Sequence, residues 1–414
     1  MQTYSLSKLL FLKLSFRVCV ALLPLIGIFF VNHLIAINEA VLLLKMLTLV
    51  IPCSYFVRSG LDVILVKRYQ MHSITRAGLV SDSKFSFLIV LIASALVSCF
   101  FYIFEILGNT LYISFVFFIY CSLYTMTQIQ AAVILAQGSF FSGAFVSLVI
   151  PNLYFLFFIL KSYVDISLTA HQVILVPSIF TFLSLIFGFI ILLRGAEKKL
   201  QKVTHSIALA WKSFVNDYPS LIIIIIPFFS HLYYSAPAAF LNDTPEKEIA
   251  FLNTLRLSMF LAILNSFATM SYYKNVASAS IETEHKQEFM RCKYWKIRVN
   301  VIFLNALLAF FLLTLVVTDV PGLIGLPIAS LPIAASIILS IYFYNLYPLR
   351  DLLLQFLLER RGYVLFVAGL WSLVVVAGTM TERDNYFVVM AMVFISLGSL
   401  LYTRKLLNTN QYKG

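Results

Sequence analysis

The sequence predicts an all-α integral membrane protein with about twelve transmembrane helices. Of its 414 residues, 61% are hydrophobic and only 12% are charged, whereas about a quarter of a soluble globular chain is charged. Apolar runs of about 20 residues, the length that crosses a bilayer, recur along the whole chain. The basic residues gather in alternate connections between these runs. A soluble fold is therefore excluded, and the length leaves no room for a sizeable soluble domain.

The predicted transmembrane segments form two sets of six. The first set is approximately 15–37, 39–58, 85–107, 110–134, 140–161 and 171–194. The second set is approximately 219–241, 249–274, 299–318, 321–348, 363–380 and 386–403. The first segment follows basic residues and resembles a signal peptide, but it is too long for a signal sequence and lacks a small-residue cleavage site. We expect it to be a retained helix.

The distribution of basic residues predicts the orientation in the membrane. When the amino terminus is placed inside, most of the 30 Lys and Arg residues fall on the inner side, and Lys161, Lys247 and Arg383 fall on the outer side. Basic residues are enriched in cytoplasmic connections. Both termini are therefore predicted to be cytoplasmic. In a membrane protein the net charge of +12 is therefore explained by membrane topology and does not indicate nucleic-acid binding.

A basic connection at 195–218 divides the chain into two halves. Apolar residues such as Leu209 and Trp211 alternate there with lysines, which predicts an amphipathic helix on the cytoplasmic membrane surface. The expected organisation is an N-lobe at 1–194, this linker, and a C-lobe at 219–414. Each lobe begins with two helices joined by a short acidic outer connection, and the second helix carries a buried basic residue. This pattern predicts a two-lobed repeat.

Charged residues inside the predicted segments are the main candidates for a binding site, because burying charge in a bilayer is costly. Lys45 and Arg256 occupy equivalent helices of the two halves, and Arg17 lies at the start of the first segment. If these helices face a central cavity, three cations converge there and suit a phosphate-bearing substrate. Structural roles remain open: Lys45 reaching the outer interface, Arg256 pairing with Glu246, Glu248 or a carbonyl, and Arg17 acting only as a topology signal.

Other polar residues in the segments are weaker candidates. Glu105 lies near the outer end of the third segment and is either a protonatable coupling group or an interfacial carboxylate. Four polar residues are expected to line a cavity or to bond between helices: Asn32, His33, His231 and Asn265. Four tyrosines are candidates for stacking on sugars: Tyr233, Tyr234, Tyr272 and Tyr273.

The sequence contains no motif for a cofactor, a metal or a common membrane enzyme. It has no Gly-rich phosphate loop, no H-E-x-x-H and no G-x-S-x-G, so an ATPase, a zincin and a serine hydrolase are unsupported. The five cysteines show no C-x-x-C spacing, which favours neither a disulfide framework nor a zinc site. The predicted outer connections are too short for an enzyme that works on an outer loop, and no repeated channel filter is visible. We therefore expect a transporter without a cofactor.

The end of the second segment carries the strongest local resemblance to a known family. The run Y-F-V-R-S-G-L-D at 55–62 continues to L-V-K-R-Y at 65–69. With the twelve-helix plan and the basic central connection, this chain resembles the polysaccharide flippases of the multidrug/oligosaccharidyl-lipid/polysaccharide exporter superfamily. Such flippases often have an aromatic residue, a glycine and an acidic residue there, followed by a basic pair. The motif adds Arg58 as a candidate for substrate binding and Asp62 as a candidate for coupling.

The resemblance implies a fold and a function. The fold is two six-helix lobes around a central cationic cavity, in the cytoplasmic membrane of a bacterium. The function is translocation of an undecaprenyl-diphosphate-linked oligosaccharide, an O-antigen or capsule unit, from the inner to the outer leaflet. Arg17, Lys45 and Arg256 match positions that contact the diphosphate in relatives. Implied partners are this substrate, membrane lipids, and the polymerase and chain-length regulator of the same pathway. Lipid II flippases carry two further helices, which favours an O-antigen or capsule unit here.

Two other functions remain open at this point. One is a multidrug or small-molecule exporter of the same fold, whose cavity is expected to hold acidic residues for cationic drugs. The other is a membrane-embedded enzyme such as a polysaccharide polymerase, which is expected to have a long outer loop or a cluster of buried histidines and carboxylates. The excess of buried cations over buried carboxylates favours the flippase.

Overall fold

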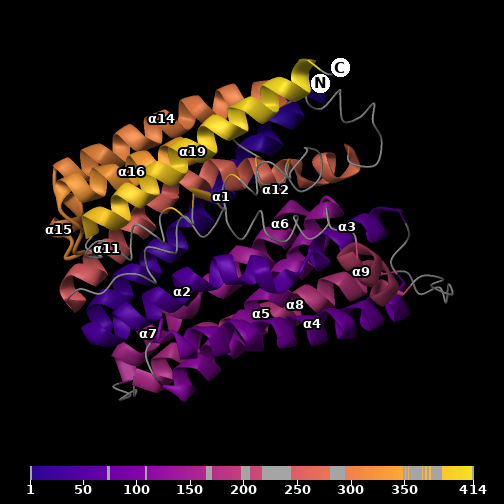
Figure 1. The fold of residues 1–414 in the computed structure, drawn as a ribbon, viewed down its shortest axis with the longest axis horizontal. Coiled ribbons are helices and arrows are strands. Elements are labelled where there is room, and N and C mark those ends of the chain that lie inside the picture. Colours follow the sequence, from indigo (N-terminus) through magenta and orange to yellow (C-terminus); the bar gives the residue numbers. More distant parts are fainter. Residues whose placement is uncertain are drawn as a thin grey trace.

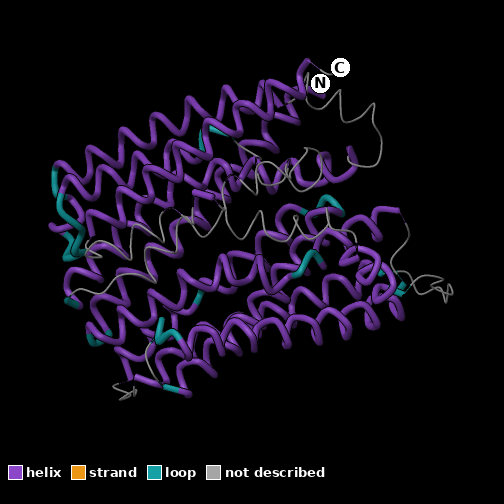
Figure 2. Tube along the Cα trace, viewed as in Figure 1, coloured by secondary structure: helices purple, strands orange, loops and turns teal. Residues whose placement is uncertain are grey.

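The computed structural model is helical, with no β-strand in the parts of the chain that it describes (Figure 2). These parts are residues 2–71, 75–107, 110–164, 170–196, 206–216, 244–279, 294–347 and 385–412, with the single positions 350, 353, 366, 369, 370 and 373.

The described residues of the first half supply nine α-helices and two short irregular turns of helix. They are α1 (Gln2–Leu34), α2 (Ile37–Arg58), α3 (Leu61–Met71), α4 (Arg76–Ile103), α5 (Leu111–Ala136), α6 (Phe140–Ala144), the π-helical η1 (Phe145–Val149), the 3-10 turn η2 (Ile150–Asn152), α7 (Tyr154–Val164), α8 (Ala170–Gly195) and α9 (Ile207–Asn216). The described helices of the second half are α11 (Pro245–Ser258), the 3-10 turn η3 (Met259–Leu261), α12 (Ala262–Ala279), α14 (Trp295–Val317), α15 (Val320–Leu323), α16 (Leu331–Tyr344) and α19 (Asn385–Tyr412).

The helices form two bundles that run side by side (Figure 1). We call them the N-bundle, in which α2, α4, α5 and α8 pack together, and the C-bundle, in which α11, α14, α16 and α19 pack together. The first helix crosses between them, because α1 contacts α7 on one side and α12 on the other. Both termini lie at the same end of the molecule (Figure 1), which we call the terminal end.

The membrane character predicted from the sequence is confirmed. Eight helical stretches among the described residues are long and apolar enough to cross a bilayer, and α16 is a shorter apolar helix. Large apolar side chains point outward from the bundles, among them Leu96 of α4, Phe303 and Phe310 of α14, and Leu401 of α19. An apolar exterior of this kind is stable in lipid, where the backbone groups bond within each helix.

Two predicted segments are interrupted at prolines. The segment predicted at 140–161 consists of α6, η1, η2 and α7, and the interruption falls at Pro151, which has no amide hydrogen to donate. The segment predicted at 321–348 is also not one helix. It consists of the short α15, a connection in which Gly325 has a φ of 74°, and α16. Pro321 lies in the first turn of α15, where proline is tolerated. The left-handed conformation at Gly325 follows the end of α15, and Pro327 lies in the connection that delays α16.

The connection expected at 58–84 contains regular structure. Residues Leu61–Met71 form α3, and α4 already begins at Arg76. The side chain of Thr75 accepts a hydrogen bond from the Gly78 amide (3.1 Å) and so caps the start of α4. This capping stabilises a helix end that hydropathy does not reveal.

The predicted linker contains the helix α9. Trp211 of α9 packs edge-on against Phe85 of α4, with ring centroids 6.0 Å apart, and its indole nitrogen donates to the Ser59 carbonyl (3.3 Å). The apolar face of α9 thus packs on the N-bundle near the terminal end. The predicted segment at 219–241 and most of the one at 363–380 lie outside the described residues.

Candidate functional site

A cavity of about 420 Å³ lies between the two bundles. Its walls come from α1, α2, α3 and α5 on one side and from α11, α12 and the end of α16 on the other. The charged residues that line it are Arg17, Arg58, Asp62 and Arg256. Three cations and one carboxylate make the described lining positive. A cavity with this charge attracts anions.

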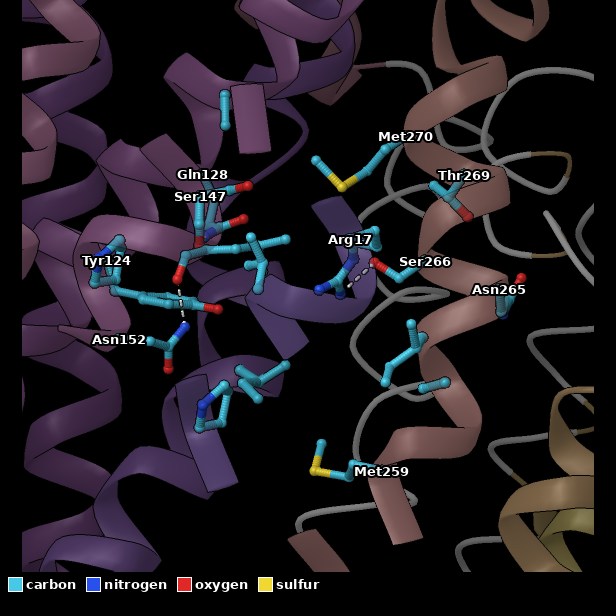
Figure 3. A pocket seen from close by; sticks show the side chains of 18 of the residues that line it. Arg17, Tyr124, Gln128, Ser147, Asn152, Met259, Asn265, Ser266, Thr269 and Met270 are labelled. Carbon is cyan, nitrogen blue, oxygen red and sulfur yellow. Dashed lines mark hydrogen bonds between the residues drawn. The ribbon is translucent and has the colours of Figure 1, made fainter. Parts of the chain in front are cut away.

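Arg17 connects the two bundles at mid-height of α1. Its Nη2 atom donates a hydrogen bond to the Ser266 hydroxyl of α12 (2.9 Å). The side chain lies between the N-bundle residues Tyr124 and Asn152 and the C-bundle residue Thr269 (Figure 3). Arg17 is therefore held in place by a neutral partner, and its charge is not cancelled by that contact.

Arg58 and Asp62 lie on the wall near the terminal end, where α2 turns into α3. The guanidinium group lies 3.4 Å from the Asp62 carboxylate and 4.2 Å from the centre of the Tyr55 ring. The turn between them has left-handed φ angles at Ser59 (49°) and Gly60 (74°). This turn brings the first residues of α3 back toward the end of α2, so that the pair faces the cavity.

Arg256 lies deeper, on the C-bundle helix α11. Its Nη2 atom donates to the Leu44 carbonyl (3.3 Å) and to the Thr48 hydroxyl (3.1 Å) of α2. It also interacts electrostatically with Tyr120 and Tyr124 of α5, which line the same cavity. The hydrogen bonds to Leu44 and Thr48 thus join Arg256 to the N-bundle through neutral groups.

The three arginines share one feature. The Nε atom of each is buried and has no hydrogen-bond partner. A buried unpaired donor costs about 1–3 kcal/mol, and the guanidinium fork is suited to the oxygens of phosphate. Arg17, Arg58 and Arg256 therefore keep unused donors that an anion in the cavity is able to bond.

Arg58 and Arg256 mark two levels of the cavity. Arg256 contacts α2 at Thr48, ten residues before Arg58, and a rise of 1.5 Å per residue places the α2 backbone at these two positions about 15 Å apart. Both guanidinium groups interact electrostatically with Tyr124 of α5. The cavity lining includes Val50, Ile51 and Tyr55 of α2 between Thr48 and Arg58. The site is therefore an elongated passage from the terminal end toward the middle of the molecule.

The two bundles meet at the opposite end of this passage. The Lys45 ammonium lies 2.8 Å from the Glu248 carboxylate, and the Asn32 amide donates to the Asn253 side chain (3.2 Å). Asn253 also donates to the Pro327 carbonyl (3.0 Å). These contacts join α1 and α2 to α11 and to the connection before α16. The described part of the cavity therefore ends at these contacts, on the side away from the terminal end.

The structure brings together some of the residues singled out from the sequence. Arg17, Arg58, Asp62 and Arg256 line the cavity, as do Asn265 and Tyr273. Lys45 is not among the described lining residues, because its ammonium group is engaged by Glu248 at the closed end. Glu105 is not among the described lining residues and lies in an exposed turn after α4, with a φ of 52°. His231, Tyr233 and Tyr234 lie outside the described residues.

Several lining residues were not singled out from the sequence. They are Tyr120, Tyr124, Gln128, Ser147, Asn152, Ser266 and Thr269, most of them visible in Figure 3. Tyr120, Tyr124 and Gln128 are spaced four residues apart on α5, so they share one face of that helix. A search for polar side chains at this spacing within an apolar segment reveals them.

Comparison with known proteins establishes the fold. No family model matches the chain, and no curated protein sequence matches it. Among solved structures, a mutant of the MATE transporter VcmN of Vibrio cholerae superposes with a TM-score of 0.58 and 14% identity, over 98% of both chains. The chain therefore has the fold of a MATE transporter along nearly its whole length. The predicted fold class is confirmed.

Proposed function

We propose that this protein is a flippase that moves an undecaprenyl-diphosphate-linked oligosaccharide across the cytoplasmic membrane by alternating access. The observation that carries the proposal is the charge of the cavity: Arg17, Arg58 and Arg256 against the single described carboxylate of Asp62. A polar headgroup that crosses hydrocarbon unaided pays a prohibitive desolvation cost. A cationic passage between two bundles removes much of that cost for a diphosphate.

The remaining lining suits the sugar part of such a headgroup. Tyr55, Tyr120, Tyr124 and Tyr273 supply aromatic faces and hydroxyls, while Gln128 and Asn152 supply amides. Aromatic rings pack against the apolar faces of sugars, and amides bond their hydroxyls in both directions. The lipid tail has no place in this cavity and remains in the bilayer.

The two arginines lie at different depths along α2, because Arg58 ends that helix near the terminal end and Arg256 contacts it at Thr48. The headgroup therefore meets Arg58 first, on the side predicted to be cytoplasmic, and reaches Arg256 afterwards. Release on the other side requires that the contacts of Lys45 and Asn32 with α11 open as the bundles rock.

An exporter of small molecules is the second candidate, because one solved structure with a similar fold is that of a MATE transporter. The positive lining favours an anionic small molecule over a cationic drug for that role. The two candidates differ in the fate of lipid-linked precursors when the gene is removed.

Deletion of the gene in its host tests the proposal. Loss of surface polysaccharide with accumulation of lipid-linked units on the inner leaflet is the expected result, restored by the wild-type gene. Arg256→Gln is expected to fail to restore export, whereas Arg76→Gln, at an exposed arginine that begins α4, restores it. Units that reach the outer leaflet without being polymerised would show that the protein is a polymerase. Unchanged precursor and polymer would favour the small-molecule exporter.

A further inference from the structure

A second group of basic and aromatic side chains lies where α14 begins, and Tyr344 is the one of its described members that also lines the cavity. Arg298 is sandwiched between two rings, with its guanidinium carbon 4.6 Å from the Trp295 ring centre and 4.3 Å from that of Tyr347. Arg350 lies nearby, 3.8 Å from the Tyr344 ring centre, and donates to the Ser399 hydroxyl (3.1 Å). Cation–π contacts of this kind hold a guanidinium group in a fixed position.

Three buried donors at the start of α14 have no hydrogen-bond partner. They are the Tyr294 hydroxyl, the Trp295 indole nitrogen and the Arg298 Nε atom. Tyr294 is fully buried, and its hydroxyl interacts electrostatically with both Arg298 and Arg350. Burial raises the pKa of this hydroxyl, so it remains a neutral donor. Three unused donors within one helical turn point to an acceptor that carries several oxygens.

The helix itself adds to the positive potential. The first turn of α14 contains Lys296 and Arg298 and no acidic residue. Cations at a helix N-terminus oppose the helix dipole, whereas an anion there is stabilised by it. The preference for basic residues on the cytoplasmic side explains the presence of these charges. This preference does not explain why the guanidinium groups of Arg298 and Arg350 stack on aromatic rings, next to buried donors that have no hydrogen-bond partner.

The outer face of α14 indicates where the anion comes from. Trp295, Val299, Phe303 and Leu307 recur every four residues and so form one stripe along the helix. Val299, Phe303 and Leu307 are 64%, 62% and 53% exposed. An apolar stripe that leads away from a phosphate site at the membrane end matches the acyl chains of a phospholipid.

We propose that the residues Tyr294, Trp295 and Arg298, supported by Arg350, form a binding site for the phosphate group of an anionic phospholipid in the leaflet at the terminal end. None of these four residues belongs to the described lining of the interbundle cavity, although Arg350 stacks on Tyr344, which does. The site does not depend on the transported substrate. The headgroup reaches the cluster from the half-buried side of Arg298, and the acyl chains lie along α14.

Native mass spectrometry of the purified full-length protein tests this site. The protein is mixed with phosphatidylglycerol or with phosphatidylcholine, and the retained lipid is counted. Wild type is expected to retain phosphatidylglycerol preferentially. Arg298→Gln is expected to weaken that binding about tenfold, the scale of one charge-assisted hydrogen bond. Arg404→Gln is the matched control, because Arg404 is an exposed arginine of α19 near the same end, and it is expected to bind as wild type does.

Tyr294→Phe keeps the test independent of folding. This change removes only a hydroxyl that has no partner, so it should leave the melting temperature unchanged or raise it while weakening lipid binding. Inorganic phosphate distinguishes the sources: displacement of phosphatidylglycerol by phosphate alone would assign the site to a free anion. Equal retention of both lipids, or equal losses in Arg298→Gln and Arg404→Gln, would overturn the proposal.

Discussion

Lys45 Nζ lies 2.8 Å from Glu248 Oε2 and so ties α2 of one bundle to α11 of the other. Both side chains are largely buried, with exposed fractions of 14% and 9%. This pair lies beside the Asn32–Asn253 contact and closes the end of the cavity that faces away from the termini. The lysine that the sequence suggested as a substrate ligand is therefore neutralised by a carboxylate in this conformation. Its position is that of a contact that must break for the cavity to open on the other side.

The ion pair predicts a specific pattern of rescue. Lys45→Gln should destabilise the protein by about 3 kcal/mol, because it removes the cation of a largely buried ion pair. The double variant Lys45→Gln with Glu248→Gln removes both charges and should regain most of the stability and of the transport. Thermal unfolding and precursor export, measured for both single variants and the double variant, check this. A double variant that is stable but still inactive would instead make Lys45 a direct ligand of the substrate.

Variants at Arg17 and Ser266 distinguish the effect of the Arg17 charge from the effect of its hydrogen bond between the bundles. Arg17→Gln removes a cavity cation and should weaken binding of a soluble sugar diphosphate about tenfold. Ser266→Ala removes only the acceptor of the 2.9 Å bond and leaves the guanidinium group free for the anion, so binding should be equal or stronger. Isothermal titration at low and high salt measures both, and the wild-type affinity should fall with ionic strength. Equal losses in the two variants would mean that Arg17 serves only to join the bundles.

The sequence predicted the fold well because lipid imposes a simple rule on it. Apolar runs such as 39–58 and 110–134 mark helices that the structure places at Ile37–Arg58 and Leu111–Ala136. The rule fails where prolines interrupt a run, as at Pro151. It also fails for α3, which is too short and too polar to cross a bilayer.

The site was predictable only in part. Buried charge is rare in a membrane, so Arg17 and Arg256 stand out in the sequence and do line the cavity. The sequence cannot distinguish a cation that faces a cavity from one that faces a carboxylate of the other bundle. Lys45 illustrates this, because Glu248 is distant in sequence and meets it only through packing of α2 on α11.

The Asp62 carboxylate pairs with the Arg58 guanidinium group, which is the group that we expect to bind a substrate phosphate. The two groups lie 3.4 Å apart on the cavity wall, so an incoming diphosphate must compete with this carboxylate. Asp62→Asn removes the competing charge and should strengthen headgroup binding about tenfold while slowing release and transport. Equilibrium binding and the transport rate, measured in the same variant, test whether binding becomes stronger while transport becomes slower. Weaker binding in Asp62→Asn would show that the carboxylate positions Arg58 and does not compete with the substrate.

The contact between α3 and α4 predicts a stability effect that is separate from transport. The Tyr69 hydroxyl donates to the Asp82 carboxylate (2.5 Å), and Arg68 lies 3.4 Å from the same carboxylate. Tyr69→Phe should lower the free energy of unfolding by about 1–3 kcal/mol, because buried Asp82 loses a donor. Tyr163→Phe, at an exposed tyrosine of α7, should have no effect.

The same hydrogen bond gives wild type a characteristic pH dependence. Burial, and then the neighbouring Asp82 carboxylate, raise the pKa of Tyr69. A raised pKa means that the neutral phenol is favoured in the folded state, so its contribution is complete below the ordinary tyrosine range and is lost as the pH rises above it. Thermal unfolding from neutral to strongly alkaline pH should therefore show a difference between wild type and Tyr69→Phe that narrows at high pH. A difference that is constant with pH would mean that ionisation of Tyr69 does not control the α3–α4 contact.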